Sequence, residues 1–142
     1  MTVKTFALIA GIVYLALGGL GFVPQLLTPV GDAPPLRLAA YHGYLLGLFP
    51  VNFMDNLAHL AVGAWGIAAA RSVGGAKAYS KTMATLFAVL TVLGLMPATN
   101  TLFGLIPIYG MDVWLHAGTA VAAAFCGWVL KGPSYIHPRP AT

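Results

Sequence analysis

Two aspartate–histidine pairs are the residues of this sequence best suited to chemistry. Asp55 precedes His59 by four residues, and Asp112 precedes His116 by the same spacing. Residues four apart lie on one face of an α-helix, so each carboxylate can contact the imidazole of its own pair. Because the chain has only three acidic residues and four histidines, these pairs hold most of the side chains that could ligate a metal ion.

The two pairs occur within an internal repeat. Leu46–Ala58 reads LGLFPVNFMDNLA, and Phe103–Leu115 reads FGLIPIYGMDVWL. The alignment places Gly47, Pro50, Met54, Asp55 and His59 on Gly104, Pro107, Met111, Asp112 and His116. Further upstream, LGGLGFVP at Leu17–Pro24 resembles LTVLGLMP at Leu90–Pro97. Each repeat is therefore predicted to contain a helix, a connection and a second helix that opens on Met-Asp.

The paired residues fit more than one role. In a structural role, Asp55 and Asp112 would complement the helix dipoles from the first turn, and the histidines would hydrogen-bond to them. In a cofactor role, Asp55, His59, Asp112 and His116 would bind a zinc, copper or iron ion. Alternatively, His59 and His116 would ligate a haem-like tetrapyrrole axially. The residue types and their spacing leave these interpretations open.

Two asparagines share the helical face of the first pair. Asn52 and Asn56 lie at the spacing that brings them next to Asp55 and His59 on a helix. We expect both amides to contact the ligand side chains without binding the metal ion themselves. Asn52 can also cap the helix that starts after Pro50.

The composition indicates that lipid surrounds the chain. Of its 142 residues, 59% are hydrophobic and 7% are charged, and the mean hydropathy is +0.85, whereas soluble domains carry about a quarter charged residues. We predict an all-α, integral membrane four-helix bundle that forms a single transmembrane domain over residues 1–142. A crossing helix needs about 20 apolar residues, and the segments that qualify are about 5–24, 54–71, 80–97 and 111–130.

Basic residues set the predicted orientation. Six of the seven flank one side of the membrane and only Arg37 the other, so both termini and the tail 132–142 are expected in the cytoplasm. The connection 25–49 would then lie outside, where it would form a cap or an interfacial helix around Leu36–Leu48. Because each repeat crosses twice, the two hairpins would be parallel repeats around an axis along the membrane normal.

Small residues are expected where these helices approach closely. The candidates are Gly18, Gly19, Gly63, Gly66, Ala120, Ala123 and Gly127. The basic residues are scattered at the predicted membrane edges and form no patch for nucleic acid, so the lipid bilayer is the expected partner.

The stretch GLFPVNFMDNLAHLAVGAWGIAAA, from Gly47 to Ala70, resembles a bacterial family of small four-span membrane proteins, the domain-of-unknown-function family 4383. The similarity extends from about Lys4 to Leu130. Its specific part is Pro50, Val51, Asn52, Asn56, His59 and Leu60. The family often has histidine where this chain has Asp55, which favours a hydrogen-bonded or acid–base pair over a four-ligand set. The resemblance implies a four-span membrane fold and supplies no activity.

The sequence contains no recognisable nucleophile or phosphate-binding motif. We therefore predict a non-enzymatic, multi-pass protein of the bacterial inner membrane, with a paired Asp/His site near its outer face that binds a metal ion or a tetrapyrrole. A second hypothesis is a structural or accessory subunit of a larger membrane complex, or a homo-oligomer. A third is a proton or small-solute transporter, because parallel repeats with ionisable groups at one depth would permit it.

Overall fold

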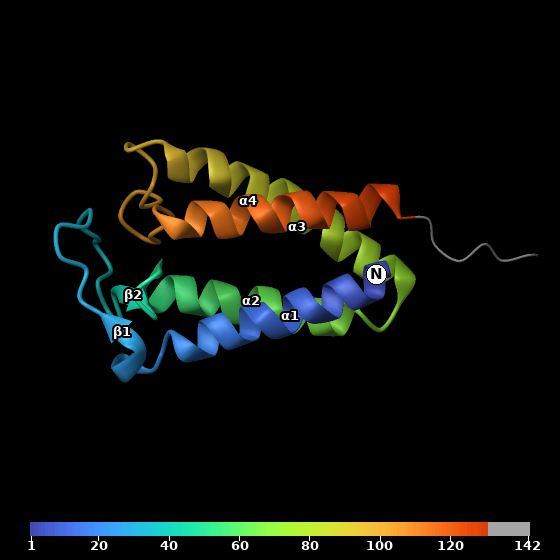
Figure 1. The fold of residues 1–142 in the computed structure, drawn as a ribbon, viewed down its shortest axis with the longest axis horizontal. Coiled ribbons are helices and arrows are strands. Elements are labelled where there is room, and N and C mark those ends of the chain that lie inside the picture. Colours follow the sequence, from blue (N-terminus) through green and yellow to red (C-terminus); the bar gives the residue numbers. More distant parts are fainter. Residues whose placement is uncertain (131–142) are drawn as a thin grey trace, which may run out of the picture.

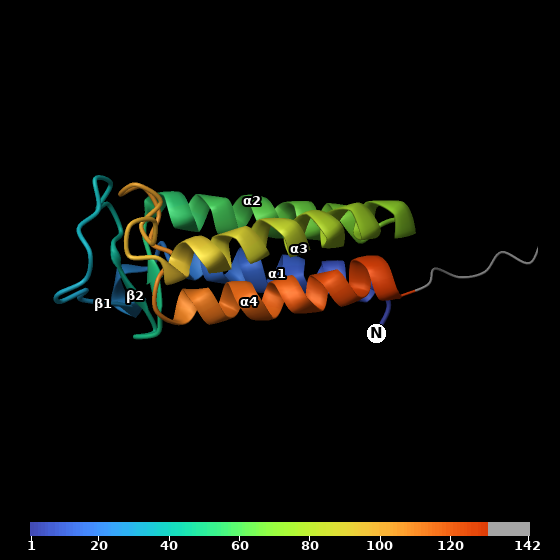
Figure 2. The same ribbon diagram turned by 90° about the horizontal axis from the view of Figure 1, so that it is seen from above.

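The structure, a computed structural model, describes residues 1–130 of the chain. Its α-helices are α1 (Val3–Leu20), α2 (Phe53–Ala69), α3 (Val73–Leu95) and α4 (Met111–Ala124). A π-helical turn, Phe125–Val129, continues α4. The helices lie together as one elongated bundle (Figures 1 and 2). The predicted helical class and its four helices are confirmed, while the predicted tail 132–142 lies outside the described residues.

One helix boundary differs clearly from the prediction. Helix α3 begins at Val73, not near residue 80. Its N-cap is Ser72, whose Oγ accepts a hydrogen bond from the Gly75 N–H at 3.0 Å. The first turns contain glycine and lysine, so hydropathy does not mark them as helical, whereas the capping residue does.

The chain forms two helical hairpins. Helix α1 packs mainly against α2, and α3 mainly against α4. Both long connections lie at one end of the bundle, and the N-terminus lies at the opposite end, together with the end of α4 (Figure 2). Helix α3 starts beside the end of α2 and diverges from it toward the end that holds the connections (Figure 1).

The first connection folds as a small sheet, so the predicted interfacial helix at Leu36–Leu48 is wrong. Strands β1 (Leu27–Thr28), β2 (Gly43–Leu45) and β3 (Phe49–Val51) form an antiparallel sheet in the order β1-β2-β3. The turn between β2 and β3 contains Leu46 and Gly47 with φ of 53° and 73°. An α-helix cannot continue through two consecutive residues in this left-handed region. The fold is mostly helical, but it is not purely all-α.

Glycines bring α1 and α2 into backbone contact. A Cβ added at Gly63 would lie 2.5 Å from the Leu15 nitrogen, and one added at Gly66 would lie 2.8 Å from the Gly11 Cα. Gly18 is equally crowded by α2, so three of the predicted small contact residues are confirmed. A Cβ added at Gly19 would have nothing within 4 Å, so this glycine is not at a close helix contact.

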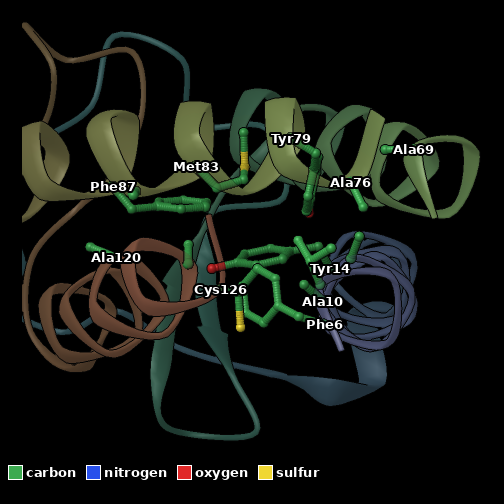
Figure 3. Close-up of a cluster of buried hydrophobic side chains, with 14 residues drawn as sticks. Phe6, Ala10, Tyr14, Ala69, Ala76, Tyr79, Met83, Phe87, Ala120 and Cys126 are labelled. Carbon is green, nitrogen blue, oxygen red and sulfur yellow. The ribbon is translucent and has the colours of Figure 1, made fainter. Parts of the chain in front are cut away.

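The core below the connections is apolar and aromatic. Tyr14 of α1 points into the centre of the bundle, where it meets Phe87 of α3, with Met83 and Cys126 nearby (Figure 3). The outer surface is also apolar: Val92 is 58% exposed, Trp114 67% and Val121 72%. Helices α1 and α3 are each long and apolar enough to cross a membrane.

Candidate functional site

The two Asp-His pairs lie near the starts of α2 and α4. Asp55 and His59 occupy the first two turns of α2, and Asp112 and His116 occupy those of α4. Asp55 Oδ2 lies 3.2 Å from His59 Nδ1, and Asp112 Oδ2 lies 3.3 Å from His116 Nε2. All four side chains are buried, none more than 5% exposed. The contact within each pair that the spacing predicts is therefore present.

Side chains from the two helices meet inside the bundle. One potential ligand atom each of His59, Asp112 and His116 lies within 4.8 Å of the other two. These three residues are called the His-Asp-His cluster below. Asp55 is not part of this group; its carboxylate lies on the Nδ1 side of His59, on the same helix. The structure thus brings the two histidines together, but it does not bring together all four predicted metal ligands.

The buried polar atoms of the two pairs make no well-aligned hydrogen bond. Asp55 Oδ2 and His59 Nδ1 contact each other and Asp112 Oδ2 contacts His116 Nε2, but neither these three buried oxygen and Nδ1 atoms nor His116 Nδ1 has another partner among the described residues. A buried polar group without a partner costs about 1–3 kcal/mol, and native proteins seldom leave several of them together. The cluster therefore has unused capacity to bind a ligand.

An aromatic row connects the two histidines. The Tyr14 ring lies 5.2 Å from the His59 ring and is stacked on Phe87, also at 5.2 Å. Phe87 in turn stacks on His116 at 4.9 Å. The Tyr14 hydroxyl shares a 2.7 Å hydrogen bond with Thr119 Oγ1 of α4, and Figure 3 shows its ring extending from α1 toward that helix. These contacts fix the faces of both imidazoles.

Sequence reasoning missed Tyr14 and Phe87. Neither belongs to the repeat or to a motif. For Tyr14 one signal was available, because its hydroxyl is the only side-chain polar group of α1 after Thr5. A lone hydroxyl within an apolar helix requires a partner on another element. Phe87 offers no such signal, since it is one apolar residue among many in α3.

The two asparagines have different surroundings. Asn52 caps α2, as predicted: its Oδ1 accepts the Asp55 N–H at 2.9 Å. Its Nδ2 also donates to the carbonyls of Leu38 and Leu105, at 2.8 and 2.7 Å. Asn56 instead lies against Gly21 at the end of α1. Asn52 therefore joins both connections to α2, and Asn56 does not face the cluster.

The two connections close over this end of the bundle. The Arg37 N–H donates to the Gly104 carbonyl at 2.8 Å, and His42 Nε2 lies 3.3 Å from the Tyr109 hydroxyl. Burial lowers the pKa of His42. Burial, together with the neighbouring Tyr44, raises the pKa of Tyr109 to about 12. His42, which belongs to neither Asp-His pair, thus lies between the two connections.

A cavity of about 230 Å³ adjoins the cluster. Asp55, His59 and His116 line one side of it, and the rest of its wall is apolar. Phe87 and Leu90 of α3 and Ile108 of the second connection belong to that apolar part.

Comparison with known protein families gives one match. A family model described as "Domain of unknown function (DUF4383)" matches residues 4–129, which contain both helical hairpins and the whole His-Asp-His cluster. Neither the curated proteins nor the solved structures gave a match. The matched description assigns no ligand, activity or partner to the cluster.

Proposed function

The chain belongs to the DUF4383 family, and because that family is described by no activity, we propose a function from the site itself: a multi-pass protein of the bacterial inner membrane that binds a transition-metal ion. His59, Asp112 and His116 are the proposed ligands. The observation that carries the proposal is the approach of their ligand atoms to within 4.8 Å inside the bundle.

The spacing suits one ion. Zinc lies about 2.0–2.2 Å from nitrogen and oxygen ligands, so two ligands of one ion are at most about 4.4 Å apart. The ligand atoms of the cluster, all within 4.8 Å of one another, are close to this separation. Imidazole and carboxylate are common ligands of zinc and iron, and imidazole also of copper. Asp55, against Nδ1 of His59, would fix the orientation and tautomer of that ligand, as carboxylates behind metal-bound histidines commonly do.

The two other interpretations of the pairs fit less well. If they only tied helices together, the carboxylate of one helix should contact the imidazole of the other, but each Asp-His contact lies within a single helix, and the buried His116 Nδ1 has no partner in the described chain. A tetrapyrrole needs more room than the cavity of about 230 Å³ provides, since even drug-sized ligands occupy pockets of about 300–1,000 Å³. A single ion needs no such space, because it would lie between the ligand atoms of His59, Asp112 and His116.

Several features support a membrane location. Helices α1 and α3 have the length and the hydropathy that a membrane-crossing helix requires. Helix α2 has 17 residues, which is the lower limit of about 17–25 for a crossing helix. Helix α4 has 14 residues and gains five from its π-helical turn. We propose that all four cross, as two parallel hairpin repeats.

The basic residues support one orientation of these repeats. Lys4, Arg71 and Lys77 lie at the end of the bundle that holds the N-terminus, and Arg37 lies in the opposite connection. By the positive-inside rule, the N-terminus is cytoplasmic and the cluster lies toward the outer face. The accessory-subunit and transporter hypotheses stay predictions of the sequence.

Metal titration of the detergent-purified protein tests the proposal. We expect the protein, stripped by chelator, to bind one equivalent of Zn²⁺ or Fe²⁺. Substitution of a residue that orients a metal ligand typically lowers metal affinity by about 10–100-fold. We expect Asp55→Asn to lower the metal affinity by an amount in that range. Substitution of a ligand, in His59→Ala, His116→Ala or Asp112→Asn, should cost more.

His42→Ala is the matched control, because this histidine lies outside the cluster and should leave affinity unchanged. The proposal fails if the unmodified protein binds no metal ion. It also fails if His42→Ala weakens binding as much as the ligand variants do.

A further inference from the structure

The cavity beside the His-Asp-His cluster has no role in holding the metal ion. It adjoins His59 and His116, yet most of its wall consists of side chains that cannot coordinate, among them Val62, Leu90 and Ile106. An apolar space next to a metal site is suited to a ligand of the ion that has no charge of its own.

The cluster leaves coordination positions free. It provides two histidines and one carboxylate, and no fourth histidine, cysteine or carboxylate within residues 1–130 belongs to the group. A set of two histidines and one carboxylate with open positions is typical of non-haem iron(II) sites. A site that only holds a structural metal, by contrast, is closed by four protein ligands.

In the proposed membrane location, the cavity opens toward lipid. Ala58 of α2 and Leu86 of α3 line it and are exposed on the outer surface of the bundle, Leu86 to 40%. The two helices that carry them diverge toward the end that holds the connections (Figure 1). On the side of the connections, Leu102, Ile106 and Ile108 cover it. A molecule that reaches the cluster by this route must dissolve in hydrocarbon.

From these observations we infer that the cluster holds iron(II) and that the cavity admits a small uncharged diatomic molecule, such as nitric oxide or dioxygen, as a ligand of that ion. The inference rests on the proposed metal site and adds the identity of the ion, the class of its ligand and the route of access. It concerns reversible binding, and no bond within the ligand is broken.

Nitric oxide is the probe. The protein is loaded with iron(II) without oxygen in lipid nanodiscs, its iron content is measured, and nitric oxide is added. An iron(II)–nitrosyl complex has a half-integer spin and is observed directly by electron paramagnetic resonance. We expect this signal in the unmodified protein, and we expect azide, a charged ligand of similar size, to displace nitric oxide poorly.

Two matched variants test the route. Ala58→Phe places a ring at the mouth of the cavity and should weaken nitrosyl formation by about tenfold, the usual scale of overpacking. Ala61→Phe makes the same change one turn along α2, at an exposed position that does not line the cavity, and should have no effect. Both variants should retain iron, because neither residue is a ligand.

The outcomes distinguish this inference from the proposed function. Iron bound without a nitrosyl signal overturns the open coordination position, while the metal site stands. Zinc usually binds such ligands more tightly than iron(II) does, so the deciding result is the loading without oxygen: a protein that binds zinc but retains no iron(II) overturns the identity of the ion alone. Equal signals in Ala58→Phe and the unmodified protein overturn the cavity as the route, and effective displacement by azide overturns the preference for uncharged ligands. If no metal ion binds, the proposed function itself fails.

Discussion

Replacing Gly63 by alanine tests the close approach of α1 and α2. An added Cβ would lie 2.5 Å from the Leu15 nitrogen and 2.8 Å from the Gly11 carbonyl oxygen. Ordinary Cβ contacts begin at 3.4 Å, so α1 would have to move by about 0.9 Å, the difference between 3.4 and 2.5 Å. Both neighbours are backbone atoms, which cannot turn aside as a flexible side chain can.

Gly118→Ala is the matched control for this substitution. Gly118 lies in α4 and has nothing within 4 Å of its added Cβ. Alanine favours a helix over glycine by about 1 kcal/mol at both positions, so this contribution cancels in the comparison. The remaining difference is the cost of overpacking, about 1–3 kcal/mol. We expect Gly63→Ala to be less stable than Gly118→Ala by that amount.

Unfolding in mixed detergent micelles, followed by helical circular dichroism, gives the two free energies of unfolding. The displacement should also reach the site, because Gly63 lies one turn after His59 and Tyr14 of α1 packs on that ring. Metal affinity should therefore fall in Gly63→Ala and not in Gly118→Ala. If Gly63→Ala is as stable as its control, the backbone contact between α1 and α2 is wrong, and so is the position of Tyr14 that depends on it.

Three further predictions follow from hydrogen bonds and charge. Asn52→Ala removes a helix cap worth about 1 kcal/mol and two hydrogen bonds of about 1 kcal/mol each. It should therefore lower the free energy of unfolding by about 3 kcal/mol, against about 1 kcal/mol for the exposed cap variant Ser72→Ala; equal losses would contradict its role in joining both connections. Tyr14→Phe keeps the ring and loses the bond to Thr119, so it should cost about 1 kcal/mol. Adding Thr119→Val should then cost little more, and full additivity in this double-mutant cycle would exclude the bond. Burial lowers the pKa of His42, so the unfolded chain binds a proton at higher pH than the folded protein does. Stability should fall as pH decreases from about 6.5 through the lower folded pKa. Thermal melting between pH 5 and 7 should show this slope in the unmodified protein and a flatter one in His42→Gln; an unchanged slope would refute the assignment.

Local features of the sequence predict much of the fold. Apolar segments of helical length give the four helices, and Asn52 is identified as a cap from its place before an apolar run. The start of α3 is missed because hydropathy does not register the helical turns after Ser72. The sheet in the first connection is missed because no residue pattern marks its short strands, whereas positive φ at Leu46 and Gly47 requires a turn between two of them.

The sequence by itself determined the contact within each Asp-His pair, because the pitch of an α-helix alone brings residues four apart together. Only the tertiary structure decided that His59 joins Asp112 and His116 while Asp55 stays behind its own histidine. It also decided that Tyr14 and Phe87 lie between the rings and that an apolar cavity adjoins them. These features depend on the angles and separations between helices. Those are set by many contacts that are distant in the sequence, such as the glycines between α1 and α2, and not by the pattern of any one segment.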